Sequence, residues 1–394
     1  MKFNKPVVTS LFYLDESILN KDFFLAPLIL AKKLSARFNF VYPRNKENNH
    51  YPKVYRDSNL IPITSDSEFE FSIWKERHTI LYVVRNAKKI NLLFLVWLNP
   101  RNLLLALIYK LLNGNGVCLI KGDMNPADYQ LDVDRNFRKQ SIKSYLKKKL
   151  YNNVDLLTCE TKETFNLIKM GLFGKSMSDK VFLLPNGFDE ETRIELKVEV
   201  YPFSQKENII LIVARIGDEV KNHEMILNSL SGLGIGDWKV IFVGNIEPSF
   251  KANIETFYRN NSGLSDSVIF VGPKYSKEDL WSYYNRSKVF LLTSHKEGFP
   301  NVFPEALRFG CFIITTCVSS SADVTDNGRV GKIIDINSDY QLRDFLTKEV
   351  FTNKIDFQTA YNESIKLCKE NFLWDKNIER LSDTPALKKL NYAK

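Results

Sequence analysis

Short apolar runs alternate with stretches of helical period along most of the chain. In its second half, β-rich runs predict strands at 208–216, 239–244, 267–272, 288–294, 311–316 and 332–336. Between them, residues 222–230 and 277–285 have the spacing of amphipathic helices. Repeated strand–helix–strand units predict a parallel sheet with both faces covered. The nearly continuous apolar run 209–214 fits a strand that is buried on both sides.

The first half follows the same alternation less regularly. Strands are expected at 7–14, 38–42, 79–84, 93–98, 116–120, 154–159 and 181–184, and helices at 23–36 and 103–112. A chain of 394 residues exceeds what one core usually supports, so two domains are expected. We assign 1–200 to the first domain and 207–375 to the second.

The net charge of +9 predicts an acidic partner. Positive charge is most concentrated in residues 135–149, which include no acidic residue. The apolar residues of this segment recur at roughly helical spacing. Two interpretations stay open for it: a contact with an anionic membrane, or a solvated helix face. No nucleic-acid module is recognisable, so nucleic acid is not expected as a partner.

The cysteines and histidines show neither a disulfide framework nor the spacing of metal ligands. The five cysteines are odd in number and scattered through apolar runs, as expected in a reducing compartment. The chain does not open on a segment that resembles a signal peptide. A cytoplasmic location is therefore expected, with a peripheral place at the inner face of the plasma membrane if 135–149 contacts lipid.

One loop carries the most specific chemistry: residues 297–305, with the sequence Glu-Gly-Phe-Pro-Asn-Val-Phe-Pro-Glu. It follows an expected strand, and Pro304 suits a first helical position while Gly310 suits the residue just past the helix end. Such loops lie at the edge of the sheet where α/β folds bind ligands and helix amides attract phosphate. Glu297 and Glu305 can accept hydrogen bonds from hydroxyls. A ligand with both phosphate and sugar is therefore predicted.

Residues 294–310 resemble the E-x7-E signature of retaining glycosyltransferases with the two-domain GT-B fold, in particular glycosyltransferase family 4 (group 1), of the bacterial polysaccharide type. The resemblance implies an α/β fold of two doubly wound, Rossmann-like parallel-sheet domains that face a central cleft. It also implies that a C-terminal helix, 376–394, packs back on the first domain. It also implies that Glu297 holds sugar hydroxyls of the donor and that Glu305 holds the ribose hydroxyls of its nucleotide. The donor-binding residues that it implies are Arg215, Lys221, Glu297, Gly298, Phe299, Pro300, Asn301, Val302, Glu305 and, beside the nucleobase, Tyr275.

Arg215 and Lys221 follow the first strand of the second domain. An arginine gives fixed, bidentate geometry and a lysine gives a mobile point charge, so the two are suited to clamping a diphosphate. The resemblance implies that this pair grips the donor diphosphate and stabilises it as the leaving group. The alternative is a surface loop with two unrelated basic residues.

The acceptor side is expected in the first domain, where a strand ends in Lys121-Gly-Asp123. Asp123 is expected to orient the acceptor hydroxyl or to take part of its proton, although many members of the family have a histidine nearby. Lys121 is expected either to contact phosphate or to pair with Asp123. Glu160 and Lys21 complete the acceptor-side candidates. Lys21 is alternatively an exposed helix start.

The resemblance implies that these residues belong to a retaining hexosyltransferase, which moves a sugar from a nucleoside-diphosphate sugar to a hydroxyl of a glycan or lipid-linked acceptor in surface polysaccharide biosynthesis. The predicted catalytic residues are Arg215, Lys221, Glu297 and Asp123. No cofactor and no metal are expected. Two alternatives stay open: a non-catalytic, transferase-like subunit that binds a carbohydrate or a partner transferase, and a GT-B nucleotide-sugar epimerase or hydrolase.

Overall fold

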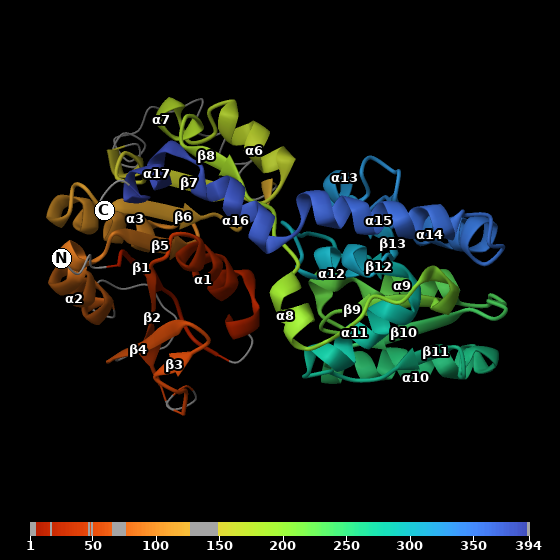
Figure 1. The fold of residues 1–394 in the computed structure, drawn as a ribbon. Helices are drawn as coiled ribbons and strands as arrows, with labels where there is room; N and C mark the ends of the chain where they lie inside the picture. Colours follow the sequence, from red (N-terminus) through yellow and green to blue (C-terminus); the bar gives the residue numbers. More distant parts are fainter. Residues whose placement is uncertain are drawn as a thin grey trace, which may run out of the picture. The chain divides into compact units, whose positions relative to one another are not determined.

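The computed structural model describes residues 5–15, 18–45, 48, 50–64, 76–126 and 149–391. The chain divides into two compact units (Figure 1): unit 1 comprises Met1–Asn186 with Trp374–Lys394, and unit 2 comprises Gly187–Leu373. Apart from Lys149, the basic segment 135–149 lies outside the described residues. No helix in the described ranges combines the length and the apolar character that a bilayer crossing needs.

Unit 1 is built on a sheet of eight described strands in the order β3-β4-β2-β1-β5-β6-β7-β8. The strands are β1 (Val7–Leu11), β2 (Arg37–Arg44), β3 (Val54–Tyr55), β4 (Ser58–Thr64), β5 (Leu92–Val96), β6 (Val117–Lys121), β7 (Leu156–Cys159) and β8 (Val181–Leu183). The short β3 pairs antiparallel with β4, and the other described pairs are parallel. All five residues of β5 are buried, as expected for a central strand covered on both faces.

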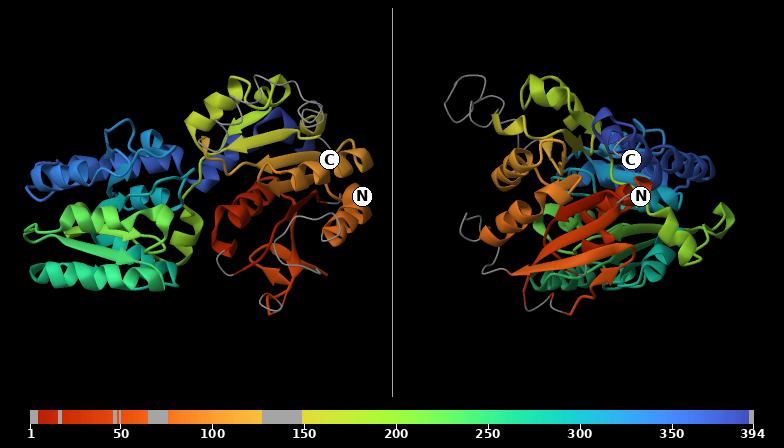
Figure 2. Two further views of the ribbon diagram at one scale, coloured as in Figure 1. Left: turned by 180° about the vertical axis from the view of Figure 1, so that it is seen from behind. Right: turned by 60° about the vertical axis from the view of Figure 1, so that its left-hand side comes forward.

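Helices cover both faces of this sheet (Figure 2). They are η1 (Ile18–Asn20), α1 (Asp22–Lys33), α2 (Arg77–Asn86), η2 (Ala87–Lys89), α3 (Pro100–Leu112), α6 (Lys162–Lys169), α7 (Lys175–Ser178), α16 (Trp374–Ser382) and α17 (Pro385–Asn391). One core lies beneath α1, α16 and α17. A second core, on the opposite face of the sheet, lies beneath α2, α3 and α6.

Unit 2 is an all-parallel sheet in the order β11-β10-β9-β12-β13-β14. The strands are β9 (Glu207–Val213), β10 (Lys239–Val243), β11 (Val268–Phe270), β12 (Ser287–Leu292), β13 (Phe312–Thr316) and β14 (Gly331–Ile334). Counted within the unit, this order is 3-2-1-4-5-6, which is that of a doubly wound, Rossmann-like sheet. The direction of winding reverses between β9 and β12.

Helices again lie on both faces of the sheet, as Figures 1 and 2 show. They are α8 (Glu190–Glu195), η3 (Phe203–Gln205), η4 (Glu219–Lys221), α9 (His223–Leu230), η5 (Pro248–Phe250), α10 (Lys251–Asn260), η6 (Ser262–Leu264), α11 (Lys277–Arg286), α12 (Val302–Arg308), α13 (Ser321–Val324), α14 (Asp339–Phe345), the π-helical turn η7 (Leu346–Val350) and α15 (Phe357–Asn371). One core lies beneath α9, α10 and α14, and the other beneath α11 and α12.

The boundary between the units, at Asn186 and Gly187, lies earlier than residue 200, the assigned end of the first domain. Residues 187–200, expected in the first domain, belong to unit 2. The reason is packing: the Phe188 ring lies 4.9 Å from that of Trp281 and 5.6 Å from that of Phe309. The Arg308 guanidinium also donates two hydrogen bonds, of 2.8 and 2.7 Å, to the Glu190 carboxylate. At the other end, α16 packs against α1 in unit 1.

Two elements of unit 1 differ from expectation. Residues 79–84, predicted as a strand from their β-branched content, lie within α2. Its buried residues, Thr79 and Val83, are four positions apart, so the burial follows a helical period. Strand β4 was not predicted, because Pro62 interrupts its apolar run. The proline is tolerated because β3 pairs with only Ser58 and Asn59, which leaves the rest of β4 at an edge.

Helix α12 begins at Val302, two residues before Pro304, so the expected placement of Pro304 at the first helical position was wrong. A proline is tolerated there all the same, because the first N–H groups of a helix have no partner within it. Gly310 does follow the helix end, with a φ of +75°. A Cβ at Gly310 would lie 2.2 Å from the Tyr361 ring, so the position also requires close approach.

Candidate functional site

β9 and β12 are neighbouring strands, and the winding of unit 2 reverses between them. The loops that follow these two strands therefore lead away from each other. Doubly wound sheets bind ligands in the crevice outside the carboxyl ends of such strands. Arg215 and Lys221 lie on the first connection, and residues 297–302 lie on the second. We call these two connections the switch-point loops.

An ion pair joins the two loops. The Lys221 ammonium donates a hydrogen bond to Oε1 of Glu297. The same carboxylate oxygen accepts a hydrogen bond of 2.8 Å from the Ser294 hydroxyl. The side chains of Lys221 and Glu297 are 22% and 15% exposed, so both are held in place and still accessible to a ligand.

The backbones of the switch-point loops are joined as well. The Thr293 hydroxyl lies 3.0 Å from the carbonyl oxygen of Lys221 and 2.9 Å from that of Asn222. The N–H of His295 donates to the carbonyl oxygen of Val220 at 2.8 Å. Asn222 has a left-handed backbone, with φ +50°, between η4 and α9. These contacts fix the position of Lys221 independently of its side chain.

Arg215 pairs with a different carboxylate. Its Nη2 lies 2.5 Å from Oδ2 of Asp218, and its side chain is 69% exposed. Asp218 also accepts a hydrogen bond of 2.9 Å from the N–H of Val220. The structure therefore places both predicted clamp cations on one loop, each with its own acidic partner. Arg215 is the more exposed of the two cations, and a surface ion pair such as its pair with Asp218 contributes little to stability.

His223 supports the first switch-point loop through a hydrogen bond to its backbone. Its Nδ1 accepts a hydrogen bond of 3.1 Å from the N–H of Gly217, and its side chain is buried. An accepting Nδ1 requires that this nitrogen carry no proton. Burial, together with the nearby Lys221 ammonium, lowers the pKa of His223 to about 4. Gly217 has a φ of +89°, and a Cβ there would lie 2.3 Å from the Phe250 side chain.

Glu305 lies in the first turn of α12, where its Oε1 accepts a hydrogen bond of 3.1 Å from the Trp281 indole N–H. Burial raises the pKa of Glu305, while Lys277 and the indole hydrogen bond oppose that rise. The contact of Glu305 with the ribose of a donor stays a prediction.

The remaining donor-side candidates differ in how far their side chains are buried. Phe299 is buried, with its ring 5.3 Å from that of Phe372, so its side chain supports the loop. Tyr275, which follows β11, is 87% exposed. The other predicted positions, Gly298, Pro300, Asn301 and Val302, lead from the Glu297 turn into α12 and are partly exposed.

The acceptor-side candidates all lie in unit 1, and two of them differ from expectation. Lys121 is completely buried, 2.7 Å from Oδ2 of Asp22 and paired with Oε1 of the equally buried Glu160. We call these three residues the buried ion cluster. The expected contacts of Lys121 and Glu160 with phosphate or acceptor are therefore wrong for this structure, because their charges face each other away from solvent.

The buried ion cluster has two carboxylates for one ammonium. Burial raises the pKa of Glu160 to about 8, against the opposing effect of Lys121. Burial lowers the pKa of Lys121, but the carboxylates of Asp22, Glu160 and Asp123 outweigh it and raise that pKa overall. Asp123 itself is exposed and accepts a hydrogen bond of 3.4 Å from the Trp97 indole N–H. Lys21 is exposed at the start of α1, as its alternative interpretation had it.

The structure adds residues that sequence reasoning did not assign. They are Asp22 and Trp97 in unit 1, and Asp218, His223, Trp281, Thr293 and Ser294 in unit 2. Only Thr293 and Ser294 carried a usable signal, since two hydroxyls directly follow an apolar strand. Asp218 and His223 act through hydrogen bonds within their own loop, whereas Asp22, Trp97 and Trp281 contact residues far away in the sequence.

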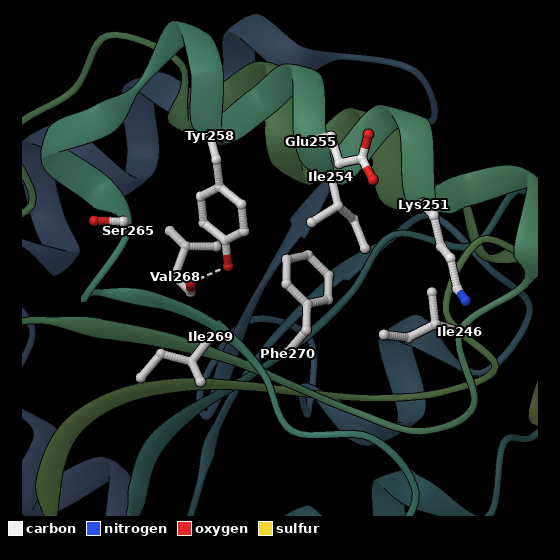
Figure 3. A pocket seen from close by; sticks show the side chains of 9 residues that line it. All are labelled: Ile246, Lys251, Ile254, Glu255, Tyr258, Ser265, Val268, Ile269 and Phe270. Carbon is white, nitrogen blue, oxygen red and sulfur yellow. Dashed lines mark hydrogen bonds between the residues drawn. The ribbon is translucent and has the colours of Figure 1, made fainter.

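A recess of about 390 Å³ lies elsewhere on unit 2, between α10 and β11 (Figure 3). Its lining is mixed, with Ile254, Phe270 and Tyr258 inside and Lys251 at one end. The Tyr258 hydroxyl donates to the carbonyl oxygen of Val268 at 2.7 Å. None of the predicted donor residues lines this recess. Across the described ranges, no group of His, Cys, Asp and Glu side chains has the arrangement of a metal site.

Comparison with known proteins identifies the second unit. Residues 194–356 match the sequence model of the family described as "Glycosyl transferases group 1". These residues form a group 1 glycosyltransferase domain. The domain lies within unit 2 and contains both switch-point loops, so the predicted resemblance is confirmed at the level of the family.

Two curated relatives match parts of the chain. A probable sucrose-phosphate synthase from Thermosipho melanesiensis is 22% identical over 204 residues, which cover 51% of this chain and 46% of that protein. The capsular polysaccharide biosynthesis glycosyltransferase CapM from Staphylococcus aureus is 41% identical over 54 residues, 14% of each chain. The matched segments thus span less than half the length of either relative.

A solved structure extends the likeness to both units. The crystal structure of HepE from Anabaena, in complex with UDP and glucose, is 14% identical and has a TM-score of 0.65. The match covers 95% of this chain and 98% of HepE. The α/β, GT-B fold class predicted from the sequence, with two doubly wound domains, is confirmed.

The buried His223, which supports the first switch-point loop, predicts that the stability of the protein depends on pH. His223 is neutral when folded but becomes protonated near its ordinary pKa of 6.5 when unfolded. Between pH 6.5 and 4 the unfolded chain therefore binds more protons, and stability falls as the pH falls. At pH 4.5 the loss of unfolding free energy reaches about 2–3 kcal/mol.

His223→Gln, which offers an acceptor and does not titrate, should lose less thermal stability than the wild type between pH 7 and 4.5. Parallel pH profiles of the two proteins would contradict this.

Proposed function

We propose that the chain is a retaining glycosyltransferase that moves a sugar from a nucleoside-diphosphate sugar to a hydroxyl of a glycan or lipid-linked acceptor. The observation that carries the proposal is the accessible Lys221–Glu297 pair at the switch point of a group 1 domain. A cation beside a carboxylate suits a ligand in which a diphosphate adjoins a hydroxyl-rich ring. HepE, a structural neighbour, was solved with UDP and glucose.

The chemistry assigned to the switch-point loops is stabilisation of the leaving group. As the bond between the anomeric carbon and the diphosphate oxygen breaks, negative charge develops on the diphosphate. Lys221 and Arg215 would offset it, and such preorganised electrostatic stabilisation is commonly the largest catalytic effect. The acceptor oxygen then bonds to the anomeric carbon on the same face, and its proton passes to the leaving phosphate or to Asp123. We propose that neither a metal nor another cofactor takes part.

A role in surface polysaccharide biosynthesis is supported by the match to CapM, which covers 54 residues of this chain. We propose a cytoplasmic protein that meets a lipid-linked acceptor at the inner face of the plasma membrane. The basic segment 135–149 would supply the contact with anionic lipid, through the charge attraction that draws lysine and arginine to such surfaces.

Nucleotide binding should be visible in a thermal-shift panel with UDP, GDP, dTDP, ADP and CMP, each without and with Mg²⁺. At a hundred times its Kd, a ligand stabilises the protein by about 2.7 kcal/mol. We expect one diphosphate to raise the Tm without metal. Lys221→Met should remove about half of that rise or more, because it removes the charge opposite the phosphate. Lys251→Met, at the recess in Figure 3, is the matched control and should behave like the wild type. No shift with any nucleotide would instead favour a non-catalytic subunit.

Turnover should depend on both clamp cations. With the donor that the panel identifies, Arg215→Ala and Lys221→Ala should each lower kcat by about a hundredfold or more, since each removes charge stabilisation from the transition state. NMR of the product should show the anomeric configuration of the donor. Wild-type rates in both variants would contradict the clamp, and an inverted product would contradict retention. Free sugar or an epimer formed from donor alone would favour the epimerase or hydrolase alternative.

A further inference from the structure

Trp97 is the residue of unit 1 whose conformation most needs an explanation. It directly follows β5, which neighbours β1 where the winding of the unit 1 sheet reverses. Its φ is +72°, a left-handed backbone that a bulky residue rarely adopts. Its side chain is 38% exposed, whereas the other tryptophans in the described ranges, Trp238, Trp281 and Trp374, are buried. A strained and exposed aromatic residue at such a point is a candidate for ligand contact.

The backbone around Trp97 enforces this conformation. Its N–H donates to the carbonyl oxygen of Lys121 at 2.8 Å. Its carbonyl oxygen accepts hydrogen bonds from the Asn102 side chain at 2.9 Å and from the N–H of Asn99 at 3.1 Å. These bonds tie the residue to β6 on one side and to the start of α3 on the other. The strain is therefore held by structure on both sides.

The ring is held as firmly as the backbone. The edge-to-face contacts of the Trp97 ring place its centroid 5.0 Å from that of Phe12 and 5.8 Å from that of Phe23. The Phe23 ring in turn lies 5.6 Å from the Lys121 ammonium of the buried ion cluster. Phe23 also directly follows Asp22, another member of that cluster. The cluster thus anchors Phe23, one of the two aromatic residues that support the Trp97 ring.

Asp123 is fixed beside the ring by the preceding glycine. The N–H of Gly122 donates to the carbonyl oxygen of Thr158 at 2.9 Å, and a Cβ at Gly122 would lie 2.7 Å from that oxygen. Only a glycine lets the chain leave β6 this close to β7. The exposed Asp123 carboxylate therefore lies at a defined place, 3.4 Å from the Trp97 indole nitrogen.

We propose that Trp97 and Asp123 form an acceptor subsite that binds a saccharide ring, with the apolar C–H face of the ring on the indole and a ring hydroxyl donating to Asp123. The inference rests on the proposed transferase function and deepens it, since it makes the acceptor a glycan end that presents a pyranose ring. An aromatic face gives apolar contact area at little entropic cost. A carboxylate accepts hydrogen bonds from hydroxyls and repels phosphate, so this pair favours a neutral sugar over a nucleotide.

The test is ligand-observed saturation-transfer NMR on the full chain with methyl pyranosides of glucose, galactose, mannose, rhamnose and N-acetylglucosamine. We expect at least one to receive saturation, strongest at the C–H protons of one ring face. Trp97→Ala should weaken its binding about tenfold, and Trp97→Phe less, because a smaller aromatic face remains. Tyr340→Ala, which removes another exposed ring, is the matched control and should bind like the wild type.

The nucleotide thermal shift, measured on the same variants, separates this inference from the proposed function. A normal nucleotide shift in Trp97→Ala, with sugar binding lost, supports the acceptor subsite. If no nucleotide raises the Tm of the wild type, the transferase proposal is contradicted, whether or not a sugar binds. The subsite itself is overturned if no pyranoside binds the wild type, or if binding is equal in Trp97→Ala. Membrane binding is another outcome that would overturn it. In that case no sugar binds, but vesicles of phosphatidylcholine and phosphatidylglycerol shift the tryptophan fluorescence of the wild type and not that of Trp97→Phe.

Discussion

The ion pair between Lys221 and Glu297 is the interaction on which the proposed donor site depends. It joins the two loops that diverge where the winding of unit 2 reverses, and the Thr293 and His295 contacts join the same loops through their backbones. Because the loops are held together without a ligand, the ammonium does not have to be ordered when a diphosphate arrives. Preorganisation of this kind is what makes electrostatic stabilisation effective in a site.

Unit 1 uses the same residue types in the opposite way. Lys121 pairs with Asp22 and Glu160 in the interior, where β6 and β7 end and α1 begins. A buried ammonium with two carboxylates costs desolvation and contributes chiefly by fixing geometry. Here it fixes α1 and the end of β6, and with them Phe23, Trp97 and Asp123. One unit therefore presents its charges to solvent, while the other uses them to position an aromatic surface.

Much of unit 2 could be predicted from the sequence, because its strands are nearly continuous apolar runs and its loop 297–305 carries a specific motif. Unit 1 was harder. Residues 79–84 are rich in β-branched side chains, yet tertiary packing makes them helical, and Pro62 conceals an edge strand. The pairing of Lys121 with Asp22 and Glu160 joins residues about a hundred and about forty positions apart, and no local pattern reveals it. His223 and Trp97 were missed for the same reason: hydrogen bonds and ring contacts from other segments define their roles.

The most direct test of the central claim compares two ligands on two variants. Calorimetry would measure the Kd of the matching nucleoside diphosphate and of its sugar conjugate for wild type, Lys221→Met and Glu297→Gln. If Lys221 binds the diphosphate and Glu297 the sugar, Lys221→Met weakens both ligands by about tenfold or more, whereas Glu297→Gln weakens chiefly the conjugate. Unchanged affinity of both ligands for both variants would contradict a donor site built on this pair.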